Sequence, residues 1–504
     1  MEHFDVVVVG AGISGIGAGF HLQDKCPDRS YVILEGRDDL GGTWDLFRYP
    51  GIRSDSDMYT MGYGFKPWTN PQSIADGPRI ISYLNETVDE FGLRDRIRFG
   101  HYVKAAAWNS NTATWTVDVE RKNSGETIQF TCNFLFMCSG YYNYEHGYEP
   151  EFEGADTFNG TVVHPQKWSE DIDYAGKKVV VIGSGATAVT VVPEMARTAE
   201  HVTMLQRSPT YMAWRPGGDV MAQRLYRLLP DKLASHLIRW RNILMGMVFF
   251  RMCRKNPERV RKMLLDSVRE QLPEGFDVEK HFTPTYNPWD QRLCLVRDGD
   301  LFQAINWGKA SVVTDHIRRF TPTGIELESG DTLEADIIVT ATGLDMQLMS
   351  GIGLSVDGEQ IEPADTLSYK GMMFSNLPNL ATCFGYTNAS WTLKCDLTCK
   401  YVCKLLNYMR KEGYEQCTPR PAADEAATEP FIDFSSGYVQ RGVARFPRQG
   451  KRKPWKVFQN YLLDKMALDF SSVDDGVMEF SRPDRSNPGN VDTGAQERAV
   501  AESA

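Results

Sequence analysis

Residues 4–15 read FDVVVVGAGISG, an apolar run that leads directly into a glycine-rich loop. The run before Gly10 is typical of a buried parallel strand, and the pattern after Ile13 favours a helix. Glycines 10 and 12 permit a tight turn and a close approach of the backbone to a ligand. Because the first N–H groups of a helix attract a pyrophosphate, this order of strand, loop and helix predicts a dinucleotide-binding unit.

A second apolar run, Tyr31 to Leu34, ends in Glu35, which lies 20 residues beyond Gly15. An acid at this distance from the loop is placed to bind a ribose hydroxyl. The first unit therefore has both the phosphate loop and the acid of a dinucleotide site.

A second loop of this kind, GSGATA at residues 183–188, follows the apolar run 179–182 and precedes another at 202–206. Its second strand ends in Gln206 rather than an acid, and Arg207 follows. A carboxylate would repel a 2′-phosphate, whereas an Arg can bind it through two hydrogen bonds. We therefore expect NADP rather than NAD here, with a solvated Arg207 as the alternative.

A chain of 504 residues exceeds what one hydrophobic core usually supports. Its fold class is predicted to be α/β, with two Rossmann-like dinucleotide-binding domains and a helical insertion in the second. Between the loops we expect a helix near 78–91 and strands at 103–108, 115–119 and 134–138. A strand at 335–343, which ends at a glycine, and a helix near 390–409 follow. The expected division is 1–145 and 377–481 for the first domain, 146–376 for the second with its insertion at about 218–290, and 482–504 as a mobile tail.

The net charge of −11 argues against a nucleic-acid partner. The longest apolar candidate, Ile243 to Phe250, is too short to span a membrane and lies between arginines 241 and 251. A strand that starts at Phe4 leaves no space for a signal peptide, so we expect a cytoplasmic location. The basic stretch 220–272 could touch a membrane surface, but a helical insertion with a solvated face is the favoured interpretation.

Ten cysteines and no CxxC spacing argue against a disulfide-reducing flavoprotein. Cys395, Cys399 and Cys403 recur every four residues, which places them on one helical face. A metal cluster is one interpretation. Burial as small apolar side chains is the favoured one, so no metal site is expected.

Two longer motifs make the prediction more specific. Residues 41–55, GGTWDLFRYPGIRSD, fit the pattern GGxWxxxxYPGxxxD, and residues 158–168, FNGTVVHPQKW, fit FxGxxxHxxxW. Together they resemble the type I Baeyer-Villiger monooxygenases, which are class B flavoprotein monooxygenases. The resemblance extends from about residue 4 to about residue 470, and the stretches 286–293 and 385–391 resemble its ethionamide-activating branch.

This resemblance implies an enzyme that uses FAD, NADPH and O2 to insert oxygen beside a ketone carbonyl. It would give an ester or lactone through a C4a-peroxyflavin, and it would also oxidise thioethers. The alternatives are a flavin monooxygenase that oxidises N or S atoms, and a flavoprotein that senses NADPH or makes peroxide without a dedicated substrate. No partner protein is implied.

Two positions depart from the family pattern. Ser169 follows Trp168 where relatives usually have Pro or Asp, and Gln291 replaces a Lys that often helps to hold the 2′-phosphate. Selectivity for NADPH is therefore expected to depend more heavily on Arg207.

The resemblance also assigns site residues. FAD would be bound by Gly10, Gly12, Ser14, Gly15, Glu35, Thr43, Trp44, Asp45, Leu46, Asp55 and Val103. NADP would be bound by Arg53, Ser54, Asp55, Gly183, Ser184, Gly185, Ala186, Thr187, Ala188, Gln206, Arg207 and Ser208.

Arg292 and Asp55 are the expected catalytic residues. A fixed guanidinium stabilises an anionic oxygen without readily protonating it, and Asp55 would hold that guanidinium in place. An interdomain ion pair is the alternative for both. His164 is expected to be structural rather than a general base, and Trp391 either lines the substrate pocket or is simply buried.

Overall fold

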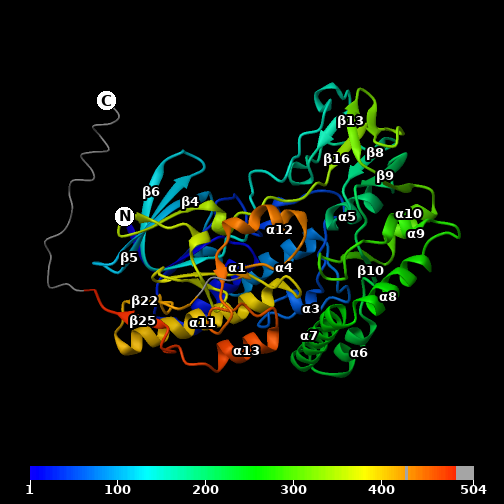
Figure 1. Ribbon diagram of the computed structural model, residues 1–504. Coiled ribbons are helices and arrows are strands. Elements are labelled where there is room, and N and C mark those ends of the chain that lie inside the picture. The colour runs from blue at the N-terminus through cyan, green and yellow to red at the C-terminus, as the bar shows by residue number, and fades with distance from the viewer. Residues whose placement is uncertain (426–428, 484–504) are drawn as a thin grey trace, which may run out of the picture.

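The computed structural model describes residues 1–425 and 429–483, and its strands form two main sheets that lie on opposite sides of the molecule (Figure 1). The first is a nine-stranded sheet in the order β18-β17-β4-β5-β6-β1-β2-β3, with β21 paired to β6. The second has five strands in the order β12-β9-β8-β16-β7. Both sheets contain the strand–loop–helix units that the sequence predicts, and the α/β fold class is confirmed.

The first sheet is built around β1, whose valines alternate between two cores. Val6 and Val8 pack on the side of helices α1 and α11, whereas Val7 and Val9 pack on the side of strands β4 and β5. A strand buried on both faces explains the unbroken apolar run. The strands span Glu2–Val9 (β1), Tyr31–Leu34 (β2), Ile97–Arg98 (β3), His101–Asn109 (β4), Thr114–Arg121 (β5), Thr127–Met137 (β6), Gly353–Val356 (β17), Glu359–Gln360 (β18) and Leu380–Thr382 (β21).

Register places the carboxyl ends of three parallel strands at one edge. Val9 of β1 pairs with Leu34 of β2 and with Met137 of β6. The loops that follow these strands therefore meet at this edge, where an α/β sheet binds its ligand. The helices around this sheet span Ile13–Lys25 (α1), Thr43–Leu46 (α2), Met58–Met61 (α3), Gly77–Glu90 (α4) and Trp391–Glu412 (α11).

The second sheet is parallel throughout, with β8 in contact with β9 and β16. Its strands span Thr161–Val163 (β7), Lys178–Ile182 (β8), His201–Gln206 (β9), Ala310–Thr314 (β12) and Ile337–Thr340 (β16). Helices α5 (Ala186–Met195) and α10 (Asp300–Asn306) cover it, and the antiparallel strands β13 (Ile317–Thr321), β14 (Gly324–Leu327) and β15 (Thr332–Glu334) extend from it.

The helices predicted over 220–272 form an insertion between β10 (Met212–Arg215) and β11 (Cys294–Arg297), which pair in parallel. They are α6 (Val220–Leu228), α7 (Asp231–Lys255) and α8 (Pro257–Arg269); a short helix beyond the predicted range, α9 (Val278–Phe282), follows in the same insertion. Among the described residues, no helix is both long enough and apolar enough to cross a bilayer.

After β16 the chain returns to the first sheet. Strand β17 pairs with β4, so this return occurs before residue 377, where we placed the boundary. The C-terminal part contains β19 (Ser368–Tyr369), β20 (Met373–Phe374), β22 (Gln416–Pro419), β23 (Glu429–Pro430), α12 (Gly437–Gly442), β24 (Arg448–Gln449), α13 (Tyr461–Asp469) and β25 (Met478–Ser481). The predicted tail, 482–504, lies outside the described residues except for its first two.

All ten cysteines are free and buried. Cys395, Cys399 and Cys403 lie on the face of α11 that packs into the first core. Their four-residue spacing is thus part of the apolar packing of this helix.

Candidate active site

The first glycine loop is too tight for side chains. Gly10 has φ +99°, and a Cβ there would lie 2.8 Å from the carbonyl oxygen of Cys138. At Gly15 a Cβ would lie only 1.8 Å from the carbonyl oxygen of Gly10. No side chain caps the start of α1 at Gly12, so its first N–H groups stay available for a phosphate.

Glu35 stands at the end of β2 beside this loop. Its two carboxylate oxygens accept hydrogen bonds from the backbone nitrogens of Ala11 at 2.7 Å and Arg37 at 2.9 Å. Burial raises the pKa of Glu35, and these two N–H groups oppose that shift. Each oxygen keeps a second lone pair, so the carboxylate is fixed in place and can still accept from a ribose hydroxyl.

A cavity of about 410 Å³ runs from this loop to the start of α5 in the second sheet. It brings together thirteen of the predicted site residues: Gly10, Gly12, Ser14, Glu35, Thr43, Trp44, Arg53, Ser54, Asp55, Val103, Ala186, Thr187 and Arg292. The tight glycine loop and the fixed carboxylate fit the phosphate and ribose of a dinucleotide. This is the fit that the resemblance requires for FAD.

Asp45 and Leu46 contribute to packing around α2. Asp45 accepts hydrogen bonds from Arg37 Nε at 2.8 Å and from Arg48 Nη2 at 2.7 Å. Leu46 packs against the core of the second sheet. Neither lines the cavity, and their assignment to FAD stays a prediction.

Arg292 and Asp55 meet in the cavity. The Arg292 Nη2 atom lies 2.8 Å from Asp55 Oδ2. The Asp55 carboxylate is the main reason that the pKa of Arg292 is raised above its ordinary value, so the guanidinium stays charged. Its side chain is 38% exposed, so part of it faces the cavity rather than protein.

Arg292 is positioned by the end of the helical insertion, where the chain enters β11. It lies two residues before β11, which pairs with β10, and the aromatic residues Tyr141, Tyr142 and Tyr438 surround it. Burial raises the pKa of Tyr141, whose hydroxyl is 2.6 Å from that of Tyr142. These three tyrosines come from outside the motifs, and sequence reasoning missed them.

Trp391 joins the cavity to α11. Its Nε1 donates a hydrogen bond to Ser14 Oγ at 2.8 Å, and its ring stacks on Tyr141 with centroids 5.1 Å apart. Since α11 starts at this residue, the helix N-terminus lies beside the first glycine loop. Trp391 therefore lines the cavity, and a role in a substrate pocket stays a prediction.

The second loop repeats the geometry of the first. Gly183 has φ +138°, and a Cβ there would lie 2.4 Å from the carbonyl oxygen of Ala341. A Cβ at Gly185 would meet nothing within 4 Å. The Ser184 hydroxyl is 2.8 Å from Thr210 Oγ1 and 3.1 Å from the carbonyl oxygen of Ser208. The loop is therefore open at Gly185, where a ligand has space, and is held in place by the close packing of Gly183 and the hydrogen bonds of Ser184.

Gln206 and Arg207 differ in whether their side chains are available to bind a ligand. The Gln206 amide is buried and donates to the carbonyl oxygen of His281 at 2.7 Å and to Thr314 Oγ1 at 2.9 Å. Arg207 is exposed and forms no ion pair within the described part of the chain. Arg207 can therefore bind a phosphate, whereas the Gln206 side chain fixes the insertion to the sheet.

Arg441 of α12 is a second cation near Arg207. Its guanidinium lies 3.5 Å from the ring centroid of Tyr148, and no carboxylate among residues 1–425 and 429–483 pairs with it. Burial lowers the pKa of Arg441, and the charge of Arg207 lowers it further. Arg441 lies outside every motif, so the sequence alone does not indicate that it approaches Arg207.

Arg53, Ser54 and His164 are held by neighbouring groups. Arg53 pairs with Asp300, and the Ser54 hydroxyl donates to the carbonyl oxygen of Ser56 at 2.7 Å. His164 accepts from the backbone nitrogen of Gln166 and lies 3.2 Å from the carbonyl oxygen of Gly343 through Nε2. Both ring nitrogens of His164 thus contact backbone, as we expect of a structural residue, and this role stays a prediction.

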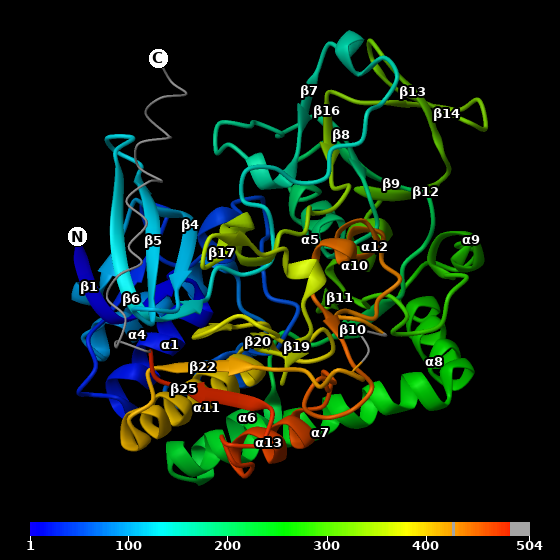
Figure 2. The same cartoon turned by 60° about the vertical axis from the view of Figure 1, so that its left-hand side comes forward.

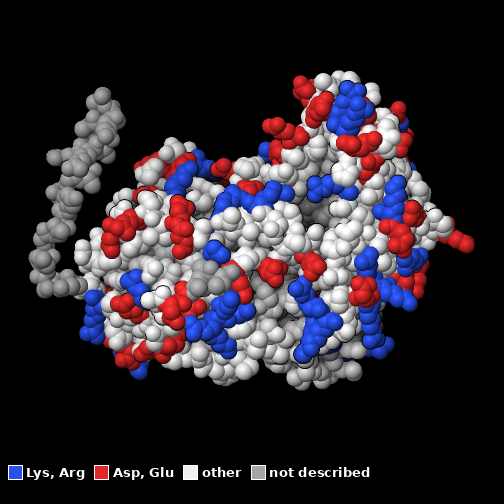
Figure 3. Space-filling view, viewed as in Figure 1, with Lys and Arg blue, Asp and Glu red and all other residues white. Residues whose placement is uncertain are grey.

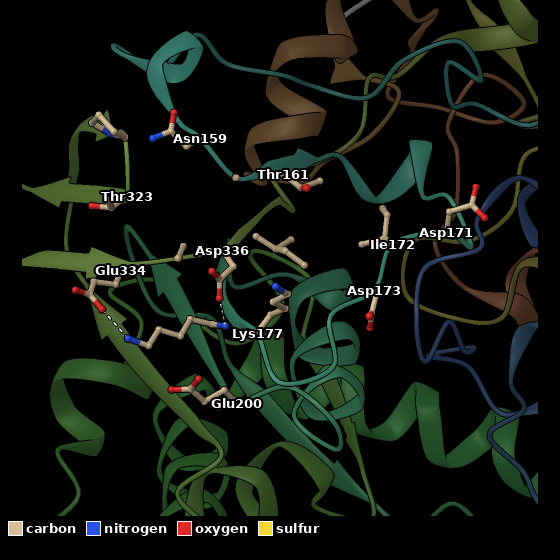
Figure 4. Close-up of a pocket in the computed structure, with 15 residues that line it drawn as sticks. Asn159, Thr161, Asp171, Ile172, Asp173, Lys177, Glu200, Thr323, Glu334 and Asp336 are labelled. Carbon is tan, nitrogen blue, oxygen red and sulfur yellow. Dashed lines mark hydrogen bonds and ion pairs between the residues drawn. The ribbon is translucent and has the colours of Figure 1, made fainter.

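A larger hollow of about 870 Å³ lies at the amino ends of β7, β8 and β16 (Figure 4). Asn159, Lys177 and Glu200 are among its polar walls, and Lys178 at its rim pairs with Glu334 at 2.6 Å. Parallel sheets bind ligands at the carboxyl ends of their strands. This hollow is at the opposite edge, so we place the active site in the smaller cavity.

Comparisons with solved structures show the same fold. An oxidised steroid monooxygenase bound to NADP superposes with a TM-score of 0.77 at 23% identity, covering 95% of this chain and 100% of the other. An open cyclohexanone monooxygenase gives a TM-score of 0.70 at 22% identity, covering 84% and 90%.

Sequence comparisons find closer relatives. The FAD-containing monooxygenase EthA of Mycobacterium tuberculosis is 53% identical over 95% of this chain and 98% of its own length. The probable FAD-binding monooxygenase AlmA of Acinetobacter baylyi is 49% identical over 95% of this chain and 97% of its own length. The flavin-binding monooxygenase-like family model matches residues 4–377. The chain therefore belongs to the flavin-binding monooxygenase-like family.

Proposed function

We propose that this flavin monooxygenase uses FAD, NADPH and O2 to insert one oxygen atom beside a ketone carbonyl, giving an ester or lactone. The observation that carries this proposal is the Arg292–Asp55 pair in a cavity that reaches both glycine loops. The names of the EthA and AlmA relatives support FAD as the flavin. An FAD bound here, once reduced by NADPH, would supply the activation of dioxygen.

The residues of the chain then determine which reaction follows. Arg292 keeps its positive charge beside Asp55 and cannot readily give up a proton, so it stabilises negative charge on a transferring oxygen. Oxygen insertion beside a ketone requires an oxygen that remains anionic, because it must act as a nucleophile on the carbonyl carbon. This requirement favours a fixed guanidinium over a histidine.

A hollow of only about 10 Å³ lies beside Arg292, too small to hold a ketone, but its walls are largely apolar. It is lined by Phe384, Ile432, Phe434 and Tyr438, together with Trp391. Apolar walls around one charged group are typical of small-molecule sites that bind the body of a ligand by burial and orient it by one polar contact. The chemical character of these walls suits a ketone with an apolar chain or ring, although the hollow itself would have to widen to admit one.

A second candidate is the oxidation of N or S atoms. The EthA and AlmA relatives have names that specify a monooxygenase but not the Baeyer-Villiger reaction. Burial raises the pKa of Tyr141 and Tyr142 beside Arg292, so both hydroxyls stay protonated and could donate a hydrogen bond to the oxygen that such a reaction transfers.

Product analysis separates the two candidates. The purified protein is incubated with NADPH, air and matched linear, cyclic and aryl ketones and thioethers. Esters or lactones from the ketones support the proposal. Oxidation of thioethers alone would assign the protein to the heteroatom-oxidising class.

Replacing Asp55 by Ala should retain FAD, because the glycine loop and Glu35 remain. It should slow ester formation by up to about 100-fold, since a displaced Arg292 no longer holds its position to within about 1 Å. The measurement is the ester formation rate at equal flavin content. A matched control is Glu326→Gln, which removes a partly buried carboxylate that pairs with Arg318 and Arg319 and does not line the cavity. An Asp55 variant with the wild-type rate would make this carboxylate only structural.

Replacing Arg207 by Ala should remove most of the preference for NADPH over NADH. A lost charge-assisted hydrogen bond corresponds to about 10- to 100-fold in the ratio of kcat/KM values. Because Arg441 stands near Arg207 without a carboxylate partner, Arg441→Gln should change the ratio in the same direction by a smaller factor. The exposed Arg420, paired with Glu479, provides the control variant Arg420→Gln. An unchanged ratio in Arg207→Ala would contradict the assignment of this residue.

A further inference from the structure

The outer face of the insertion carries an unusual set of exposed apolar side chains. Leu233, Leu237, Leu244 and Val248 of α7 are 47%, 43%, 46% and 59% exposed. Their spacings of four, seven and four residues put them on one side of the helix. We call these four residues the α7 face. A row of this kind on a surface marks a site of interaction.

Neighbouring helices extend the apolar surface. Leu228 at the end of α6 is 79% exposed, and Met466 of α13 is 62% exposed. Helix α6 contacts α7, and the ring of Trp240 on α7 lies 5.8 Å from that of Tyr461 on α13. Figure 2 shows these three helices along the lower edge of the molecule. Exposed apolar side chains therefore lie on three helices of which α7 contacts both of the others.

The charge around this surface is strongly positive. Residues 220–256 contain eight Lys and Arg but a single acid, Asp231, although the whole chain has a net charge of −11. Within the described residues, five of these cations form no ion pair: Arg224, Arg227, Lys232, Arg251 and Lys255. Figure 3 shows Lys and Arg gathered over the insertion at the lower right.

Polar contacts hold the opposite side of α7 against the rest of the protein, so the α7 face remains directed toward solvent. Arg239 Nη1 donates to the carbonyl oxygen of Gly62 at 2.7 Å, and Asn242 Nδ2 donates to Asp57 Oδ1 at 2.9 Å. Ile243 packs on Tyr386, which lines the catalytic cavity. One helix therefore separates the apolar surface from the active site.

We propose that the α7 face and the cations around it bind the surface of an anionic lipid bilayer. An amphipathic helix with apolar and basic residues binds such a surface in the plane of the headgroups without crossing it. A second copy of the chain fits less well, because pairing these faces would bring the same unpaired cations together. This inference goes beyond the oxidation chemistry and would place the cavity beside the phase in which apolar substrates dissolve.

The test is cosedimentation of the full chain with two kinds of vesicle, phosphatidylcholine alone and phosphatidylcholine mixed with phosphatidylglycerol. The protein should bind the mixed vesicles, bind the neutral ones much less, and be released by high salt. The double variant Arg224→Gln/Arg227→Gln should bind about 25-fold more weakly, at about fivefold for each cation.

Two further variants test the apolar part. Leu237→Gln/Leu244→Gln should lower binding by at least about tenfold, while NADPH oxidation without vesicles stays at the wild-type rate. The control Trp307→Gln changes an apolar side chain that is 71% exposed at the end of α10, and its binding should not change.

Three results would overturn the proposal. The first is a wild-type protein that stays in the supernatant with anionic vesicles. The second is equal binding by wild type and Leu237→Gln/Leu244→Gln. The third is a lipid-free dimer, seen by analytical ultracentrifugation, that this double variant dissociates, because the face would then belong to a second copy.

Discussion

Replacing Arg292 by Ala is expected to lower the rate of oxygen insertion by about 100- to 1,000-fold, the usual cost of losing one fixed charge at a developing oxyanion. Arg292 lies outside both glycine loops, so the variant should keep FAD and still bind NADP. The variant should therefore bind both cofactors normally while its rate of oxygen insertion falls. The electrons from NADPH would then reduce O2 to hydrogen peroxide, and little ester would form.

Flavin absorbance, NADPH oxidation, peroxide and ester are measured together on this variant. Arg292→Lys is the matched comparison, since it keeps a positive charge near Asp55 but lacks the planar guanidinium, and it should recover only part of the rate. Normal ester formation from a good ketone by Arg292→Ala would remove this residue from the reaction.

Replacing Gly15 by Ala is expected to abolish FAD binding. A Cβ at this position would lie 1.8 Å from the carbonyl oxygen of Gly10 and 2.9 Å from its carbonyl carbon. Neither atom is a movable side chain, so the loop that would hold the pyrophosphate has to change shape. The measurement is the flavin content of the purified protein and its recovery after incubation with excess FAD.

Gly185→Ala is the matched control in the second loop. A Cβ there meets nothing within 4 Å, and the backbone is extended at φ −80° and ψ −176°. This variant should fold and keep FAD but bind NADPH more weakly, because the methyl group enters the space above the loop. Full flavin content in Gly15→Ala would contradict the role of the first loop.

Local signals explain which elements could be predicted from the sequence. β2 has the predicted bounds, Tyr31–Leu34, and β9 starts one residue before its predicted first residue, Val202. Buried parallel strands are read from short apolar runs, and both glycine loops follow such runs directly. The positions of Gly10, Glu35 and Gly183 at the strand ends therefore follow from the sequence.

Contacts between distant segments could not be predicted in this way. Arg292 and Asp55 are separated by more than 200 residues, and only the family resemblance suggested their pairing. Gln206 looked like a ligand residue, but its amide binds His281 and Thr314 of later elements. The approach of Arg441 to Arg207 depends on where the C-terminal part places α12, which packs against the core of the first sheet, and no local pattern encodes this position.

The most direct test of the proposed reaction is mass spectrometry of the product formed from a ketone, NADPH and isotope-labelled dioxygen. The account predicts an ester or lactone that carries one labelled oxygen atom, formed in step with NADPH oxidation. Recovery of unchanged ketone while NADPH is consumed, with all labelled oxygen in peroxide or in oxidised thioethers, would contradict it.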